Sequence, residues 1–357
     1  MKSVFLDDCV MQKNMPASAG SRALDSFVSL IDSEAAARLV NNGYTIAGRV
    51  KGCEFGFSDV FSNELEAFDI VKQIAEGRAC FGLVNDVFGF YGMRAAESNL
   101  FCIRPTYGRV SRYGLIQSVP STDQLGIICD DISGGFEALS VISGRDEKDG
   151  AMFKEIPRGL HVPREKITVG VPEEILKNAS ADAQRAARGF IKKFDATNIE
   201  IIYFNQMKHV IYILSCAELS ASLARYDGLN FGYASKDGEG LEDLYVKSRS
   251  EAFGLCVKLA LIVGAAVLSA ENYARHYEKA MRIRRLIKQS LDFAGYDAVI
   301  LPGAINGCAY ENLSLGAVSR LAGLPAVSFN YDGIGLQLIG GVNNEDLLFE
   351  ILKRGLA

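Results

Sequence analysis

The chain contains 357 residues, which is enough for roughly two domains of average size or for one large α/β domain. It carries 38 lysines and arginines and 43 aspartates and glutamates, so its net charge is −5, and 49% of its residues are hydrophobic. This composition is typical of a globular protein with a substantial core. The acidic balance argues against a protein that grips nucleic acid by its phosphates, and we expect no direct nucleic-acid binding.

The pattern of cysteines indicates a reduced compartment, and it indicates no metal site. Eight cysteines are spread singly along the chain, the closest pair is Cys80 and Cys102, and no CxxC motif occurs. None of the three histidines stands at metal-ligand spacing from a cysteine. The sequence therefore predicts no disulfide framework, no metal or other cofactor, and a cytoplasmic location in which the cysteines act as small apolar residues.

Membrane insertion is not predicted. The N-terminus lacks a signal-peptide pattern, because Lys2 is followed almost at once by Asp7 and Asp8. The longest apolar run, 259–268, is too short to span a bilayer and follows Lys258. We interpret this run as a buried helix and expect no association with membranes.

Strand-like apolar runs alternate with helical patterns in the first part of the chain. A strand is predicted over 4–10, and Asp32 or Ser33 can cap the helix that follows. Gly43 gives that helix a stop signal. The next predicted elements are a strand over 44–50, a helix over 64–76 and a strand over 80–84.

The same alternation continues to the C-terminus. It indicates an α/β fold with a central mixed β-sheet that helices cover on both faces. We expect a single domain over 1–357, in which the charged stretch 144–164 is a surface loop. The elements predicted in this part are strands over 166–171, 199–204, 298–301, 326–329 and 335–339, a helix over 181–194 and a closing helix from Asn344.

Residue patterns alone give no standard catalytic motif. The chain has no nucleotide-binding P-loop, no GxSxG elbow, no HExxH and no EF-hand loop. The glycines of 133–135 and 89–92 favour a capped turn and a buried turn over ligand loops. The run 103–115 holds three arginines, which can bind a phosphate or carboxylate or can tie down a rigid loop. The basic run 275–288 is typical of a solvated helix face.

A colinear set of motifs resembles the amidase signature family, and more narrowly the A subunit of the tRNA-dependent amidotransferases. The resemblance starts with the run 103–115 and its continuation to Gly126, and it spans nearly the whole chain. It implies one α/β domain with a mixed sheet between helices. The further matching motifs are ARYDG (224–228), FGY (231–233), SRSEAFG (248–254), LAGLP (321–325) and GLQLIG (335–340).

The resemblance also implies a catalytic triad. The family uses a serine nucleophile, a second serine that relays its proton, and a buried lysine that accepts and returns that proton. By their flanking residues, these three positions are occupied here by Phe90, Glu66 and Asp7. The glycine- and serine-rich loop is replaced by the helix-like run 64–70, and we expect the family's N-terminal helical segment to be missing. No member of the triad is intact, which predicts an inactive site.

Two positions that contact the glutamine substrate in the family persist as Tyr233 and Arg284. Arg284 would pair with the substrate carboxylate. The acidic partner expected before the LAGLP motif is replaced by about Leu313. The alternative is that Tyr233 and Arg284 remain only for packing and helix solubility.

These features lead to three hypotheses. The favoured one is an inactive amidase-fold protein that acts as a scaffold or partner, in contact with the B and C subunits of an amidotransferase or with a paralogous subunit. The second is an active glutamine-hydrolysing subunit that supplies ammonia for the formation of Gln-tRNA and Asn-tRNA. The third is a sensor that binds glutamine or a related small amide through Tyr233 and Arg284.

Two other catalytic arrangements have little support. Asp7 and Glu66 could act as paired carboxylates, but such a pair needs a shaped pocket and shifted pKa values. Cys9 or Cys80 could replace the nucleophile, but no histidine has a recognisable place beside either cysteine.

Overall fold

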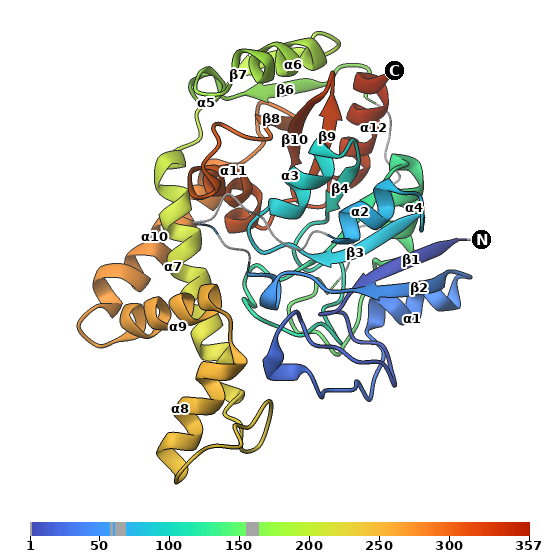
Figure 1. Cartoon of the computed structure of the whole chain (residues 1–357). Coiled ribbons are helices and arrows are strands. Elements are labelled where there is room, and N and C mark those ends of the chain that lie inside the picture. Colours follow the sequence, from blue (N-terminus) through green and yellow to red (C-terminus); the bar gives the residue numbers. More distant parts are fainter. Residues whose placement is uncertain (1, 58–59, 61–68, 155–163) are drawn as a thin grey trace.

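A mixed β-sheet with helices on both faces runs through the computed structural model of the chain, and it confirms the predicted α/β fold (Figure 1). The structure describes residues 2–57, 60, 69–154 and 164–357. The ten strands of this sheet are β1 (Ser3–Asp7), β2 (Thr45–Val50), β3 (Phe81–Asn85), β4 (Phe101–Arg104), β5 (Leu125–Cys129), β6 (Thr168–Val171), β7 (Asp195–Asn198), β8 (Ala298–Pro302), β9 (Ala326–Tyr331) and β10 (Ile334–Gly340).

The sheet is parallel at its two ends and antiparallel in its middle. Its strand order is β2-β1-β3-β5-β4-β9-β10-β8-β6-β7. β1 runs parallel to β2 and β3, and β6 runs parallel to β7 and β8. Every other pair is antiparallel, from β3 with β5 to β10 with β8. Parallel neighbours require crossover connections, which explains the alternation of strands and helices in the sequence.

Helices lie in most of the connections between the strands, but β4 is joined to β5, and β9 to β10, without a helix. The described α-helices are α1 (Glu34–Asn41), α2 (Asp69–Ala75), α3 (Phe90–Glu97), α4 (Ile132–Ile142), α5 (Glu173–Lys177), α6 (Ala181–Ile191), α7 (Phe204–Ser222), α8 (Leu241–Ala252), α9 (Leu255–Leu268), α10 (Lys279–Ser290), α11 (Ala309–Ala322) and α12 (Glu345–Leu356). A π-helical turn, Tyr273–Glu278, leads into α10.

Successive residues of β9 show which helices cover which face, because neighbouring side chains in a strand point to opposite sides. Ser328 faces α3, where a Cβ atom on Gly92 would lie 2.7 Å from its hydroxyl. Phe329 faces α6, and its ring centroid lies 4.9 Å from that of Phe190. By the same alternation and the strand registers, α2 and α3 cover one face of the sheet, and α4, α6 and α12 cover the other.

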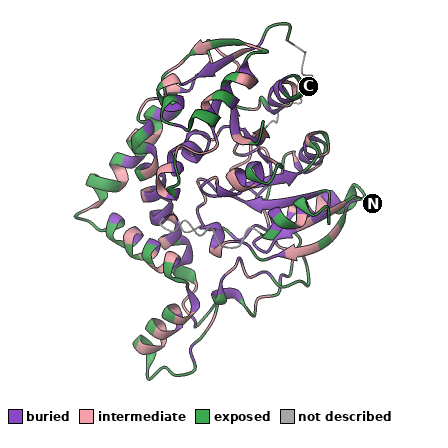
Figure 2. Cartoon of the chain, turned by 45° about the horizontal axis from the view of Figure 1, so that its top comes forward, coloured by how far each residue is buried: buried purple, intermediate pink, exposed green. Residues whose placement is uncertain are grey.

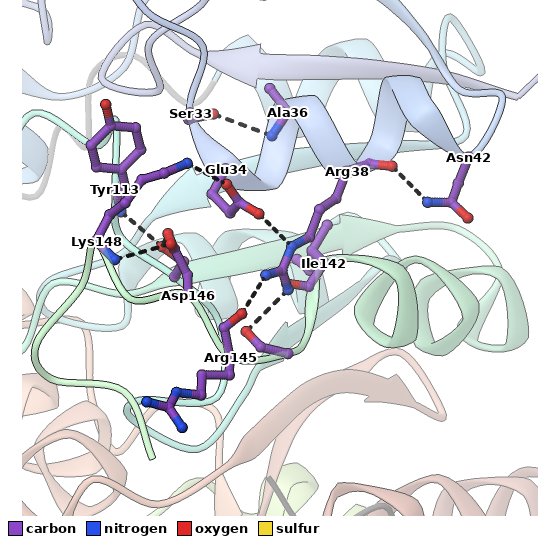
Figure 3. Close-up of polar contacts among 12 residues, drawn as sticks. Ser33, Glu34, Ala36, Arg38, Asn42, Tyr113, Ile142, Arg145, Asp146 and Lys148 are labelled. Atoms are coloured by element: carbon purple, nitrogen blue, oxygen red, sulfur yellow. Dashed lines mark hydrogen bonds and ion pairs between the residues drawn. The ribbon is translucent and has the colours of Figure 1, made fainter. Parts of the chain in front are cut away.

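The capping prediction for the first helix is confirmed. Ser33 Oγ accepts a hydrogen bond from the backbone N–H of Ala36 at 3.2 Å (Figure 3), and Gly43 has the left-handed φ of +82° expected after a helix. The capped turn predicted over 133–135 is confirmed as the first turn of α4, which starts at Ile132 with Asp131 as its cap.

The predicted strand over 199–204 is wrong. The strand that pairs with β6 is β7, Asp195–Asn198, and α7 begins at Phe204. β7 is a polar edge strand, so its sequence lacks the apolar run that predicts a strand. The apolar side chains of Ile201 and Phe204 are buried after the strand instead.

The run 259–268 is helical, as predicted, but the prediction that this helix is buried is wrong for one of its sides. This run belongs to α9, which packs against α7 through one side only and leaves Leu259 and Ile262 exposed. Within the described ranges, no single helix has both the length and the apolar composition to cross a bilayer. α9 and the segment Tyr273–Ser290 satisfy that test only as a pair bent by 100°.

Candidate functional site

The turn from β3 into α3 is the centre of the candidate site. Asp86 follows β3, and its carboxylate accepts hydrogen bonds from the N–H groups of Gly89 at 2.7 Å and Gly92 at 3.2 Å. Gly89 has a φ of +103°, which an L side chain rarely adopts. These contacts hold the turn in one shape, so the glycines of 89–92 form a buried turn, as predicted, which opens a helix.

Phe90 occupies the position predicted for the nucleophile. It is the first residue of α3 and is 2% exposed. Its ring lies 6.3 Å from that of Phe88, which in turn lies 4.8 Å from Phe57. A cavity of about 20 Å³ borders Phe90, with Met93, Asn312 and Gln337 among its other lining residues. That volume admits about one water molecule, so aromatic packing fills this place.

Asp7 occupies the position predicted for the lysine, at the end of β1, and is buried. Its carboxylate accepts hydrogen bonds from the Tyr91 hydroxyl at 3.0 Å and from the backbone N–H of Cys9 at 3.1 Å. Burial, and then the negative charge of Asp8, raise the pKa of Asp7 to about 7. A carboxyl with this pKa is neutral or negative near neutral pH, and it is never cationic.

The structure places two of the three predicted triad positions on neighbouring segments of the chain. Tyr91 bonds to Asp7 and directly follows Phe90, so the end of β1 lies beside the first turn of α3. Gly52 adjoins the same contact, since a Cβ atom there would lie 2.5 Å from the Asp7 carboxylate. Glu66 lies outside the described residues. Sequence reasoning missed Tyr91 as a member of this site, because its partner is 84 positions away.

A buried ion pair supports the turn from the other side. Arg320 of α11 lies 2.9 Å from the Asp86 carboxylate and also donates to the Asp86 carbonyl at 3.1 Å. Arg104 donates to the Thr122 carbonyl at 2.9 Å and approaches the Asp86 carbonyl at 3.4 Å. Burial, and then the charge of Arg320, lower the pKa of Arg104 to about 9. The charged side chains around the turn therefore serve to hold it in place.

The remaining two arginines of the run 103–115 have internal partners. Arg112 makes a bidentate contact with Asp149, with Nε 3.0 Å and Nη2 2.9 Å from the carboxylate oxygens. Arg109 pairs with Glu345 at 2.8 Å. These contacts favour the rigid-loop interpretation of this run over anion binding.

A second network holds the loop after α4 against α1 (Figure 3). Arg38 donates to the carbonyls of Ile142, Gly144 and Arg145 at 2.9–3.1 Å, and its Nε lies 2.9 Å from Glu34. In the expected surface loop 144–164, Asp146 and Asp149 are buried and accept hydrogen bonds from Ser111 and Arg112, while residues 155–163 lie outside the described ranges.

Tyr233 lies on the loop before α8, against the N-terminal part of the chain. Its hydroxyl donates to Glu251 at 2.6 Å and accepts from Arg22 at 2.9 Å. The Arg22 guanidinium also lies 4.2 Å from the centre of the Tyr233 ring. The Tyr233 side chain thus links its own loop to α8 and to the segment around Arg22.

Arg284 lies on α10 and has internal partners as well. Nε donates to the Leu321 carbonyl at 3.0 Å, and Nη1 and Nη2 donate to the hydroxyl and carbonyl oxygens of Ser121 at 2.8 and 3.1 Å. Leu313, at the position expected for an acidic partner, is fully buried in α11. Among the residues that the structure describes, Arg284 and Tyr233 share no bonding partner, and neither borders the cavity beside Phe90.

Arg284→Ala is expected to lower the free energy of unfolding by about 1–3 kcal/mol, because three hydrogen bonds from a charged group are lost. Arg285→Ala is the matched control, since Arg285 is exposed and forms no ion pair with a described residue; its effect should stay within about 0.5 kcal/mol. Urea unfolding measures both values. Equal effects would contradict the structural role, and a glutamine-dependent rise in Tm that Arg284→Ala abolishes would favour the sensor hypothesis.

Two alternatives to the missing triad, a metal centre and a cysteine nucleophile at Cys9, find no support in the described part of the chain. The described part of the chain contains no group of three or more histidine, cysteine, aspartate or glutamate residues that could hold a metal ion. Burial, and next the charge of Asp7, raise the pKa of the Cys9 thiol well above its ordinary value. Cys9 therefore stays protonated and is a poor nucleophile.

The mixed sheet with helices on both faces places the chain in the α/β class, and the candidate site lies where β1 meets the turn between β3 and α3. The sequence pattern of the Amidase family matches residues 74–348. The A subunit of glutamyl-tRNA(Gln) amidotransferase from Listeria monocytogenes serotype 4b (strain CLIP80459) is 30% identical over 395 residues, which cover 98% of this chain and 81% of that protein. The chain belongs to the amidase family.

Other relatives agree with this assignment. The corresponding glutamyl-tRNA(Gln) amidotransferase protein of Macrococcus caseolyticus is 31% identical over 397 residues, with 97% of this chain and 81% of the relative covered. The crystal structure of its Thermotoga maritima counterpart is 23% identical, with a TM-score of 0.77 and coverage of 99% of this chain and 82% of that chain. The structure of 6-aminohexanoate cyclic dimer hydrolase, at 16% identity and 84% coverage of its chain, also has a TM-score of 0.77. These two structures share the fold.

Proposed function

We propose that this chain is an amidase-family protein without amidase activity, which acts as a scaffold or partner subunit within or beside a tRNA-dependent amidotransferase. The observation that carries the proposal is the turn between β3 and α3, where Phe90 takes the place expected for the nucleophile. A buried phenylalanine has no nucleophilic atom, and the cavity that it borders is water-sized.

Asp7 supports the same proposal. The resemblance to the family places a lysine here, which must accept a proton from a serine and return it. An aspartate side chain is negative or neutral, whereas a lysine side chain is positive or neutral. The Asp7 carboxylate also accepts hydrogen bonds from Tyr91 and Cys9. Glu66, the third position, lies outside the described residues, so the structural support comes from Asp7 and Phe90.

A second candidate is an active glutamine-hydrolysing subunit. The observation in its favour is the similarity to amidotransferase A subunits over 98% of the chain. This candidate requires catalytic residues other than Asp7, Glu66 and Phe90. It predicts ammonia release from glutamine, whereas the favoured proposal predicts none.

Association with the other amidotransferase subunits tests the partner half of the proposal. The tagged full chain is mixed with the purified B and C subunits, and the mixture is separated by size-exclusion chromatography. We expect the chain to elute with at least one of these subunits, and the chain alone to release no ammonia from glutamine or asparagine. Elution as an isolated monomer would contradict the partner role, and ammonia release would contradict the inactive site.

A further inference from the structure

The helices α8, α9 and α10 expose an unusual share of apolar surface. Of the 18 large hydrophobic side chains that are exposed in the described residues, nine lie within 241–290. These helices project to one side of the sheet (Figure 1), and their outward sides are largely exposed (Figure 2). A concentration of exposed apolar side chains on this scale marks an interaction site more often than chance exposure.

α9 is apolar on all sides, but it is covered on only one. Lys258 is the single charged residue among its 14 residues. The side that faces α7 carries Val257, Ala260, Gly264 and Val267, all buried. A Cβ atom on Gly264 would lie only 2.1 Å from the Cys216 carbonyl, so α7 and α9 are in close contact there. A helix that is hydrophobic all round is normally buried all round.

The free side of α9 carries a narrow stripe made of Leu255, Leu259, Ile262 and Ala266. Leu255 is 71% exposed, Leu259 43% and Ile262 66%, and Ala266 is also exposed. The spacing between successive members is four, three and four residues, which is the spacing of the contact seam in a coiled coil. A stripe with this spacing is the kind of apolar seam that packs against a second α-helix.

Charge near the stripe defines the partner further. Residues 255–290 hold seven lysines and arginines and two glutamates, a net charge of +5, although the whole chain carries −5. Within the described residues, Arg275, Lys279, Arg285 and Lys288 form no ion pair. These cations lie on the segment Tyr273–Ser290, which starts five positions after α9 ends and meets it at 100°. An acidic partner would be attracted to this segment, whereas a second copy of the chain that docked through the same segment would be repelled by it.

We propose that the stripe Leu255, Leu259, Ile262 and Ala266 docks an acidic amphipathic α-helix of a partner protein, while the basic segment 273–290 contacts the acidic side chains of that helix. The proposal deepens the proposed function and rests on it for the idea that the chain works with a partner subunit. A bilayer fits less well, because an interfacial helix carries lysines and arginines along its own polar face and α9 has only Lys258.

The test measures binding of a fluorescent model helix to the full chain. The probe has about three heptads, with leucines at four- and three-residue spacing and glutamates beside them, and its control carries lysines in place of the glutamates. We expect the acidic helix to bind at least about tenfold more tightly than the basic one, with an affinity that falls as salt rises. Failure of the wild-type chain to bind the acidic helix would overturn the proposal.

Matched variants locate the binding surface. Leu259→Glu combined with Ile262→Glu should weaken binding at least about tenfold, because it places charge in the stripe. Leu30→Glu combined with Val40→Glu adds the same charge at two exposed apolar positions elsewhere and should leave binding unchanged. Circular dichroism confirms that both double variants are folded. Equal binding by the stripe variant and the wild type would also overturn the proposal.

Two further outcomes would replace the acidic helix with another occupant. Stripe-dependent binding to phosphatidylglycerol vesicles, without binding to the helix, would identify a membrane surface. A wild-type dimer that the stripe variant converts to a monomer, again without helix binding, would identify a second copy of the chain. Glutamine turnover is measured separately, so ammonia release would overturn the proposed function and leave the helix-binding result standing.

Discussion

An Arg320→Met variant is expected to lose about 3–5 kcal/mol of its free energy of unfolding. Arg320 pairs with Asp86 at 2.9 Å, and both side chains are more than nine-tenths buried. The substitution leaves the Asp86 carboxylate buried without its main counter-charge and removes the hydrogen bond to the Gly316 carbonyl. Because Asp86 orders the turn that carries Phe90, this is the largest effect that we expect from a single polar substitution.

Urea unfolding at neutral pH measures this loss. Arg282→Met is the control, because Arg282 makes an exposed ion pair with Glu278 and should contribute less than about 1 kcal/mol. A double-mutant cycle with Asp86→Asn should give a coupling energy of about 1–3 kcal/mol. If Arg320→Met costs no more than Arg282→Met, the ion pair does not support the turn.

Asp7→Asn is expected to make the protein less sensitive to pH. The pKa of Asp7 is about 7 in the folded protein, against an ordinary value of 3.8. Between these values the folded state keeps a proton that the unfolded state has released, so stability falls as pH rises through this window. Above pH 7 the full penalty of about 4 kcal/mol is present, and below 3.8 it is absent.

The comparison of Asp7→Asn with wild type therefore depends on pH. The difference in unfolding free energy should change by roughly 2–3 kcal/mol in favour of the variant between about pH 5 and pH 8. Asparagine keeps an acceptor for the Cys9 N–H, and it carries no charge to bury. Asp25→Asn, at an exposed aspartate, should show no such change. A constant difference between the Asp7 variant and wild type across this range would contradict the buried, proton-retaining carboxyl.

The sequence predicted those parts of the fold that depend on local patterns. The Ser33 cap, the Gly43 stop and the apolar strands are short-range signals, and the structure confirms them. The sequence does not predict the edge strand β7, because its residues are polar, and the apolar run after it predicts a strand that the structure lacks. The sequence does not predict the exposed side of α9, because a helix that is apolar all round carries no pattern that marks which side stays uncovered.

The candidate site could be predicted only in part for a similar reason. The flanking motifs assign Asp7 and Phe90 to two triad positions, and in the structure the end of β1 lies beside the turn that starts α3. The contacts that support this site join residues far apart in the chain, such as Asp86 with Arg320, which are 234 positions apart. No local spacing encodes such pairs. The three arginines of 103–115 likewise admitted two interpretations until their partners were known.

Ammonia release by the assembled complex tests the central claim most directly. The chain is combined with the B and C subunits of an amidotransferase, and its turnover of glutamine is compared with that of a complex whose own A subunit is intact. An inactive site predicts no release above the level without the chain. Clear turnover that persists in Phe90→Ala and Glu66→Ala variants would contradict the account, because it would place the active site elsewhere in this chain.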